Sequence, residues 1–70
     1  MTKSPLQSLI RAEAIRARHY VSDVLNGLVP GDALYDPIYD AVAVNGGTDF
    51  SRVSDENMLV MAAAVRKLRA

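Results

Sequence analysis

Apolar residues recur with a helical period along the first third of the chain. From Ser4 onward they fall three and four positions apart and stop near Leu25, the spacing of an amphipathic α-helix. Ser4 can cap this helix, Pro5 suits its first position, and Asn26-Gly27 predict a left-handed stop. We therefore expect a helix over 5–25 whose buried face carries Leu6, Leu9, Ile10, Ala14, Ala17, Tyr20, Val21, Val24 and Leu25.

A second long stripe closes the chain. Ser54 is followed by two acidic residues, which favour the positive end of a helix dipole, and three basic residues stand in the last turn. Val53 and Met58 have the spacing of a hydrophobic staple. The pattern predicts a helix over 55–69 with a core face of Met58, Met61, Ala64, Val65 and Leu68.

The middle of the chain allows two interpretations. Val29-Pro30-Gly31-Asp32 indicates a turn, and Asp36-Pro37 is typical of a helix start. A short helix over 37–44 would turn Ile38, Ala41 and Val42 inward and end at Asn45-Gly46-Gly47. The alternative is a β-hairpin over 41–53 around the Asn-Gly turn. We favour the helix, because a lone hairpin is marginally stable.

These elements predict an all-α fold, a compact three-helix bundle formed by one domain over 1–70. A hairpin in 41–53 would make the fold α+β instead. The two long helices are expected to pack antiparallel, with the short helix as a lid. Alanines at 14, 17, 62 and 64 would allow close approach of the helices.

The composition of the chain limits the kinds of site it can form and the cellular locations we expect for it. The chain has no cysteine, so disulfides and thiolate metal sites are excluded, and a chain this short is expected to gain stability from self-association or a partner. Its longest apolar run, Met58 to Val65, is too short to span a membrane, and Met1 to Pro5 lack the apolar stretch of a secretory signal. The expected location is the cytoplasm or a virion. Arginine outnumbers lysine, which suits a GC-rich bacterium or its phage.

No motif indicates catalysis, a cofactor or a metal. His19 and Asp23 form one pair at helical spacing, which is too few ligands for zinc. Gly46-Gly47 matches neither a phosphate loop nor a dinucleotide fingerprint. The evenly spaced aspartates lack the glycine and terminal glutamate of a calcium loop: Asp32, Asp36, Asp40 and Asp49. Turn formation explains Asp32 and helix capping explains Asp36. We expect no catalytic, cofactor-binding or metal-binding residue.

Glu13 is the residue whose position most needs explaining, because it interrupts the apolar face of the first helix. A charge there requires a partner. We expect a pair with Arg66 or Arg69, or a hydrogen bond from a tyrosine hydroxyl. An enzyme would need Glu13, His19 and a tyrosine in one pocket. Tyr35 and Tyr39 are spaced as an aromatic pair at the rim of the core.

Two sets of side chains are candidates for contacts with other molecules. Apolar or amphipathic residues away from the main stripes would bind a protein partner or a second copy: Ala12, Ile15, His19, Leu59 and Ala63. Basic residues of the long helices would bind nucleic acid: Arg11, Arg18, Arg66, Lys67 and Arg69.

The absence of chemistry, the small size and the surplus apolar positions predict a small non-enzymatic protein–protein interaction module, such as an adaptor, inhibitor or assembly subunit. The alternative is a small nucleic-acid-binding transcriptional regulator. It is less favoured, because net charge is zero, residues 29–57 carry six acids against one arginine, and the expected helix connections exceed a helix-turn-helix turn.

Overall fold

The computed structural model describes residues 4–70, so Met1 to Lys3, considered above for a secretory signal, lie outside it. Three α-helices follow one another along the chain, α1 (Pro5–Gly27), α2 (Tyr35–Val44) and α3 (Asp55–Arg69), with a 3₁₀ turn, η1 (Phe50–Arg52), before the last. No strand occurs in residues 4–70. The predicted all-α three-helix bundle is confirmed, and the alternative hairpin over 41–53 is wrong.

Glycines end α2 at the point where the hairpin turn was considered. Gly46 and Gly47 have φ angles of 127° and 93°, in the left-handed region that suits glycine. The Gly47 amide donates to the Val42 carbonyl at 2.9 Å, which satisfies an end carbonyl of α2. A side chain at Gly46 would approach Val53 to 2.9 Å, so this turn also packs closely on the segment before α3.

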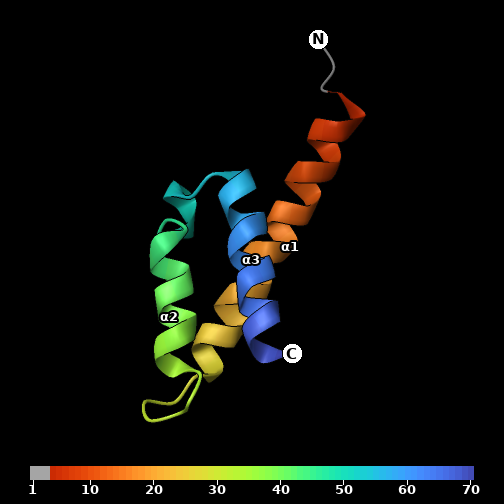
Figure 1. Ribbon diagram of the computed structural model, residues 1–70. Helices are drawn as coiled ribbons and strands as arrows, with labels where there is room; N and C mark the ends of the chain where they lie inside the picture. Colours follow the sequence, from red (N-terminus) through yellow and green to blue (C-terminus); the bar gives the residue numbers. More distant parts are fainter. Residues whose placement is uncertain (1–3) are drawn as a thin grey trace.

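The helices run down, up and down, so α1 and α3 are parallel (Figure 1). Arg11 of α1 contacts Asp55 at the start of α3, whereas Tyr20 contacts Arg66 and Arg69 near its end. The expected antiparallel packing is therefore wrong. Helix α2, with ten residues or about 15 Å, returns the chain part of the way along α1.

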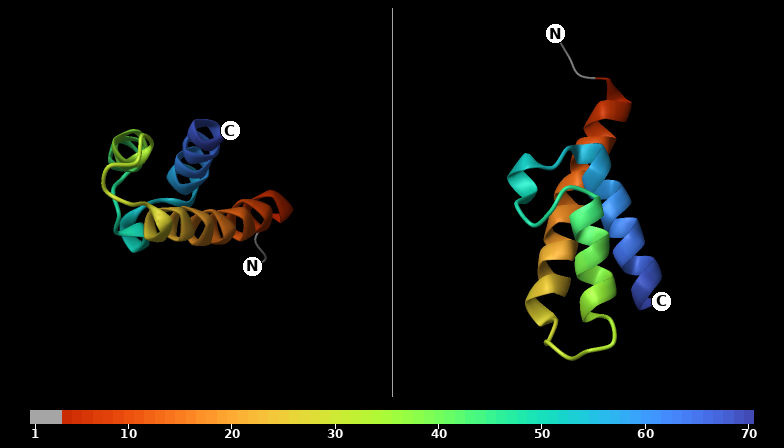
Figure 2. Two further views of the ribbon diagram at one scale, coloured as in Figure 1. Left: turned by 90° about the horizontal axis from the view of Figure 1, so that it is seen from below. Right: turned by 60° about the vertical axis from the view of Figure 1, so that its left-hand side comes forward.

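The core lies between α3 and the other two helices, because α2 and α3 lie on one side of α1 and α3 packs against both α1 and α2 (Figure 2). Its members are all apolar: Ala14, Ala17, Val21 and Val24 of α1, Ile38 and Val42 of α2, Val53, and Met58, Met61, Ala62 and Val65 of α3. Helix α2 thus supplies two fully buried side chains and is a layer of the bundle rather than a lid. Leu68, expected in the core, lies one turn past Val65 and is 37% exposed, so it does not belong to the buried core.

The starts of α1 and α3 agree with the sequence prediction, whereas the end of α1 and the start of α2 differ from it. Ser4 and Ser54 accept hydrogen bonds from the amides three residues on, at 3.2 and 3.1 Å, as predicted. Helix α1 continues through Gly27 and ends on extended Leu28 rather than on a left-handed glycine. Helix α2 begins at Tyr35 because a preceding turn bonds the Tyr35 amide to the Asp32 carbonyl at 3.0 Å. Asp36 therefore lies in the first turn and does not cap the helix.

The first two turns of α1 project beyond the start of α3 (Figures 1 and 2). Helix α1 has 23 residues and α3 has 15, or about 34 and 22 Å, and the molecule measures 49 × 23 × 17 Å. Leu6 and Leu9 on this segment are 67% and 64% exposed. Their expected burial is a wrong prediction, because no helix lies opposite them.

Candidate interaction surface

The projecting end of α1 presents three large aliphatic side chains, which we call the N-terminal apolar end: Leu6, Leu9 and Ile10. The two leucines are exposed and Ile10 is half-buried at the edge of the bundle. A recess of about 300 Å³ lies beside Ile10, between α1 and the first turn of α3, and its other lining residues are Gln7, Arg11, Asp55 and Glu56. An apolar ridge thus stands next to a polar recess.

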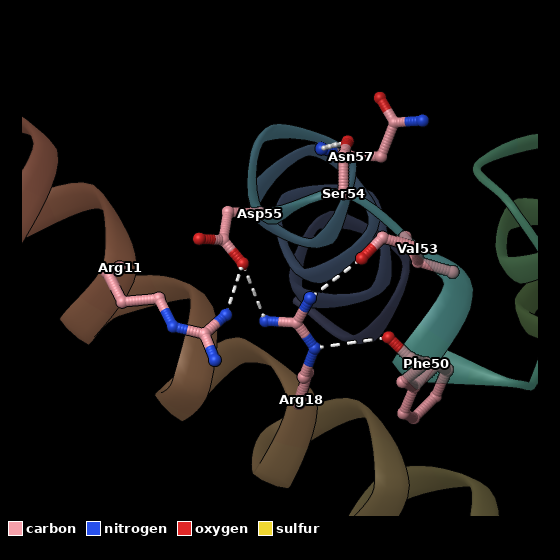
Figure 3. Close-up of polar contacts among 7 residues, drawn as sticks. All are labelled: Arg11, Arg18, Phe50, Val53, Ser54, Asp55 and Asn57. Atoms are coloured by element: carbon pink, nitrogen blue, oxygen red, sulfur yellow. Dashed lines mark hydrogen bonds and ion pairs between the residues drawn. The ribbon is translucent and has the colours of Figure 1, made fainter.

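Three charged residues fix the height at which α3 begins, and we call them the Asp55 clamp: Arg11, Arg18 and Asp55 (Figure 3). The Asp55 Oδ1 atom accepts from Arg11 Nη1 at 2.8 Å and from Arg18 Nη1 at 3.0 Å. These guanidinium groups, with the Arg18 hydrogen bond as the largest cause, hold the pKa of the Asp55 carboxyl below its ordinary value. Asp55 therefore stays ionised at neutral pH.

Arg18 also ties α1 to the segment between α2 and α3. Its Nη2 atom donates to the Val53 carbonyl at 2.7 Å and its Nε atom to the Phe50 carbonyl at 3.2 Å. A single guanidinium thus satisfies two loop carbonyls and one carboxylate, a use of its planar donor fork that lysine could not copy. Arg18 acts here as a structural residue.

The structure divides the five basic residues that were candidates for nucleic-acid binding. Arg11 and Arg18 are engaged in the Asp55 clamp at the start of α3. Arg66, Lys67 and Arg69 are exposed in the last turn of the same helix. Because a 15-residue helix is about 22 Å long, the two groups lie at opposite ends of α3 and do not form one patch.

The five predicted partner-binding residues do not form one surface either. Ala12, Ile15 and His19 are exposed on the side of α1 that faces away from its buried alanines, and Ile15 is 43% exposed. On α3, Leu59 is half-buried and packs against the core, while Ala63 is exposed. Leu59 is therefore partly used in the bundle itself.

The exposed leucines were missed because periodicity assigned them to the core. A signal that could have found them is present in the sequence, since the two long helices were predicted with 21 and 15 residues. A stripe that is longer than its partner helix must project at one end. Val60, at 54% exposed, is a second apolar position that sequence reasoning did not single out.

Glu13 has a local partner. Its carboxylate pairs with Arg16 one turn along α1, and both side chains are largely exposed. The expected pair with Arg66 or Arg69 is wrong, because the parallel packing brings the end of α3 beside Tyr20 instead. Tyr35 and Tyr39 do form the expected pair, with ring centroids 4.8 Å apart.

The rest of the described chain, residues 4–70, shows no buried polar side chain and no metal-binding cluster. Every buried residue in the structure's range is apolar, and residues 4–70 hold no group of three or more acidic or histidine side chains placed to bind a metal ion. A helix with the length and apolar character needed to cross a membrane is also not found in that range. Comparisons with protein-family models, curated proteins and solved structures gave no significant match.

Proposed function

We propose that the protein is a small non-enzymatic interaction module that acts by binding another protein or a second copy of itself. The observation that carries this proposal is the N-terminal apolar end. Leu6 and Leu9 continue the core stripe of α1, yet they are about two-thirds exposed. Burying one such leucine is worth about 1.5–3 kcal/mol, so the segment offers a partner substantial binding energy.

The spacing of the three side chains supports binding through a helix face. Leu6, Leu9 and Ile10 stand at positions i, i+3 and i+4, the anchor spacing with which amphipathic helices enter apolar grooves. Two projecting turns of helix gain little stability by themselves, so packing on a partner would also stabilise the segment. Arg11, Asp55 and Glu56 supply a polar rim of both signs beside these anchors.

The test compares three proteins: the wild type, the double variant Leu6→Ser/Leu9→Ser and the control Val44→Ser. Val44 is 82% exposed at the end of α2, so its variant loses an exposed apolar side chain elsewhere. Sedimentation velocity over a concentration series measures self-association. We expect a complex that the wild type and Val44→Ser form and the double variant does not.

Binding to another protein is measured by the same comparison. The three proteins are used as bait in extracts of the native host, and a captured protein counts only if its purified form binds the wild type and Val44→Ser but not the double variant. A monomeric wild type, together with no protein whose binding depends on Leu6 and Leu9, would overturn the proposal.

The alternative function, a nucleic-acid-binding regulator, receives less support because two of its five basic residues belong to the Asp55 clamp. A salt titration separates the two functions. Affinity for nucleic acid falls steeply as salt rises, because counterions are released on binding, whereas an apolar contact changes little.

A further inference from the structure

Two arginines share one tyrosine ring at the end of α3. The Arg66 and Arg69 guanidinium carbons lie 4.6 and 5.7 Å from the centroid of the Tyr20 ring. The Tyr20 hydroxyl accepts a hydrogen bond from Arg69 Nη1 at 3.1 Å. These contacts lie within the range of cation–π attraction and hold both guanidinium groups over the last turns of α1 and α3.

Within residues 4–70, neither guanidinium group is joined to a carboxylate by an ion pair. The ion pairs found in residues 4–70 involve Arg11, Arg16 and Arg18, not Arg66 or Arg69. Each guanidinium has five N–H donors, and stacking on a ring occupies its face while leaving its edge available. Two like charges held beside one ring repel each other, and an anion between them would relieve that repulsion.

We propose that Tyr20, Arg66 and Arg69 form a binding site for a phosphate group, either inorganic phosphate or a phosphomonoester. A phosphate carries about −1.5 to −2 charges at neutral pH, which matches two arginines, and it accepts paired hydrogen bonds from guanidinium edges. The negative end of the α3 dipole, about half a charge, opposes only part of this attraction. Lys67 adds a further exposed positive charge in the same turn. This site is separate from the N-terminal apolar end and does not depend on the proposed function.

The experiment is a titration of the full chain, labelled with ¹⁵N, by sodium phosphate, with sodium chloride at matched ionic strength as the reference. Saturable amide shifts are expected at Tyr20 and in residues 66–70, and chloride should not reproduce them. Arg66→Gln and Arg69→Gln should each weaken phosphate binding about tenfold, since a hydrogen bond to a charged group is worth about 1.5 kcal/mol or more. Arg52→Gln is the matched control, because Arg52 is exposed and lies in η1.

Tyr20 variants distinguish a built site from charge alone. Tyr20→Leu keeps every charge but removes the ring, and it should weaken binding several-fold. Tyr20→Phe keeps the ring and should retain most of the affinity. If Tyr20→Leu does not fold, as circular dichroism would show, the exposed arginine variants still decide the matter.

Two further ligands identify the source of the phosphate. If phosphoserine and inorganic phosphate bind with similar affinity, the result supports a site that recognises the phosphate group itself. Much tighter binding of a nucleoside 5′-monophosphate would support the site with a nucleotide as the carrier. Shifts that do not saturate, or an Arg52→Gln variant that loses as much affinity as Arg66→Gln, would overturn the proposal.

Discussion

The two parts of α1 have the same apolar periodicity and opposite surroundings. From Ala14 to Val24 the buried residues of the stripe are small or β-branched: Ala14, Ala17, Val21 and Val24. From Leu6 to Ile10 it consists of larger aliphatic residues, of which the two leucines are exposed. Within α1, the buried positions therefore carry smaller side chains than the exposed positions at its start.

The difference lies in α3 rather than in α1. Helix α3 begins at Asp55, which the clamp holds beside Arg11 and Arg18, so α1 has an opposing helix only from that level onward. Below it, Ala14, Ala17 and Ala62 all lie in the buried core, where small side chains let the helices approach closely. Above it, bulky leucines carry no such constraint and remain available to another molecule.

The strongest test of this division places an aspartate in the buried core and, for comparison, in the projecting part of α1. Met61→Asp places a charge at a fully buried position, where an uncompensated charge costs about 3–5 kcal/mol. The total stability of a chain of this size is about 3.5–10 kcal/mol, so the variant should lose a large share of its free energy of unfolding. Urea unfolding followed by circular dichroism measures the loss.

Leu9→Asp is the matched change in the projecting part. It should shift the free energy of unfolding by no more than about 0.5 kcal/mol, as for other exposed positions. A large loss for Leu9→Asp in a monomeric sample would contradict the exposure of this segment, and an intact Met61→Asp variant would contradict the core.

A smaller loss is expected from a substitution that overfills the helix contact. Ala17→Leu adds three carbons at a position that is 2% exposed, and overpacking of a core costs about 1–3 kcal/mol. For a domain of this size each kcal/mol lowers Tm by about 4–8 °C. Ala12→Leu, on the exposed side of α1, should leave the thermal melt nearly unchanged. Equal melting of the two variants would mean that α1 and α3 do not pack through alanines.

Periodicity and capping predicted where the helices lie, because both are local properties. Helix α3 has the predicted bounds, and α1 differs only at its end. The direction of α3 and the height at which it starts depend on the path of residues 28–54. Arg18 holds that segment through hydrogen bonds to two of its carbonyls, far along the chain, which no local pattern reveals. The wrong predictions for Leu6, Leu9 and Glu13 arose because the sequence does not reveal how α3 is aligned along α1.

Arg18 should matter more than its neighbour in the clamp. Arg18→Met keeps the apolar stem but removes the donors to Phe50, Val53 and Asp55, and leaving carbonyls without a partner costs about 1–3 kcal/mol. Arg11→Met removes one ion pair from a side chain that is half exposed, where such pairs contribute about 0–1 kcal/mol. Urea unfolding of both variants measures the difference. A loss for Arg11→Met as large as that for Arg18→Met would show that the loop carbonyls do not depend on Arg18.

The last and smallest expected effect is the pH dependence of the border between the two parts of α1. The pKa of Asp55 is lowered in the folded state, so its ionised form stabilises the fold above the unfolded value of about 3.9. That contribution is lost as pH falls through the lowered folded pKa. The stability difference between the wild type and Asp55→Asn should therefore be constant at neutral pH and shrink below about pH 4. In an Arg18→Met background the same difference should be smaller at neutral pH, because the hydrogen bond from Arg18 is the largest cause of the lowered pKa. An undiminished difference in that background would assign the clamp to Arg11, and the start of α3 would then be held from the projecting side of α1.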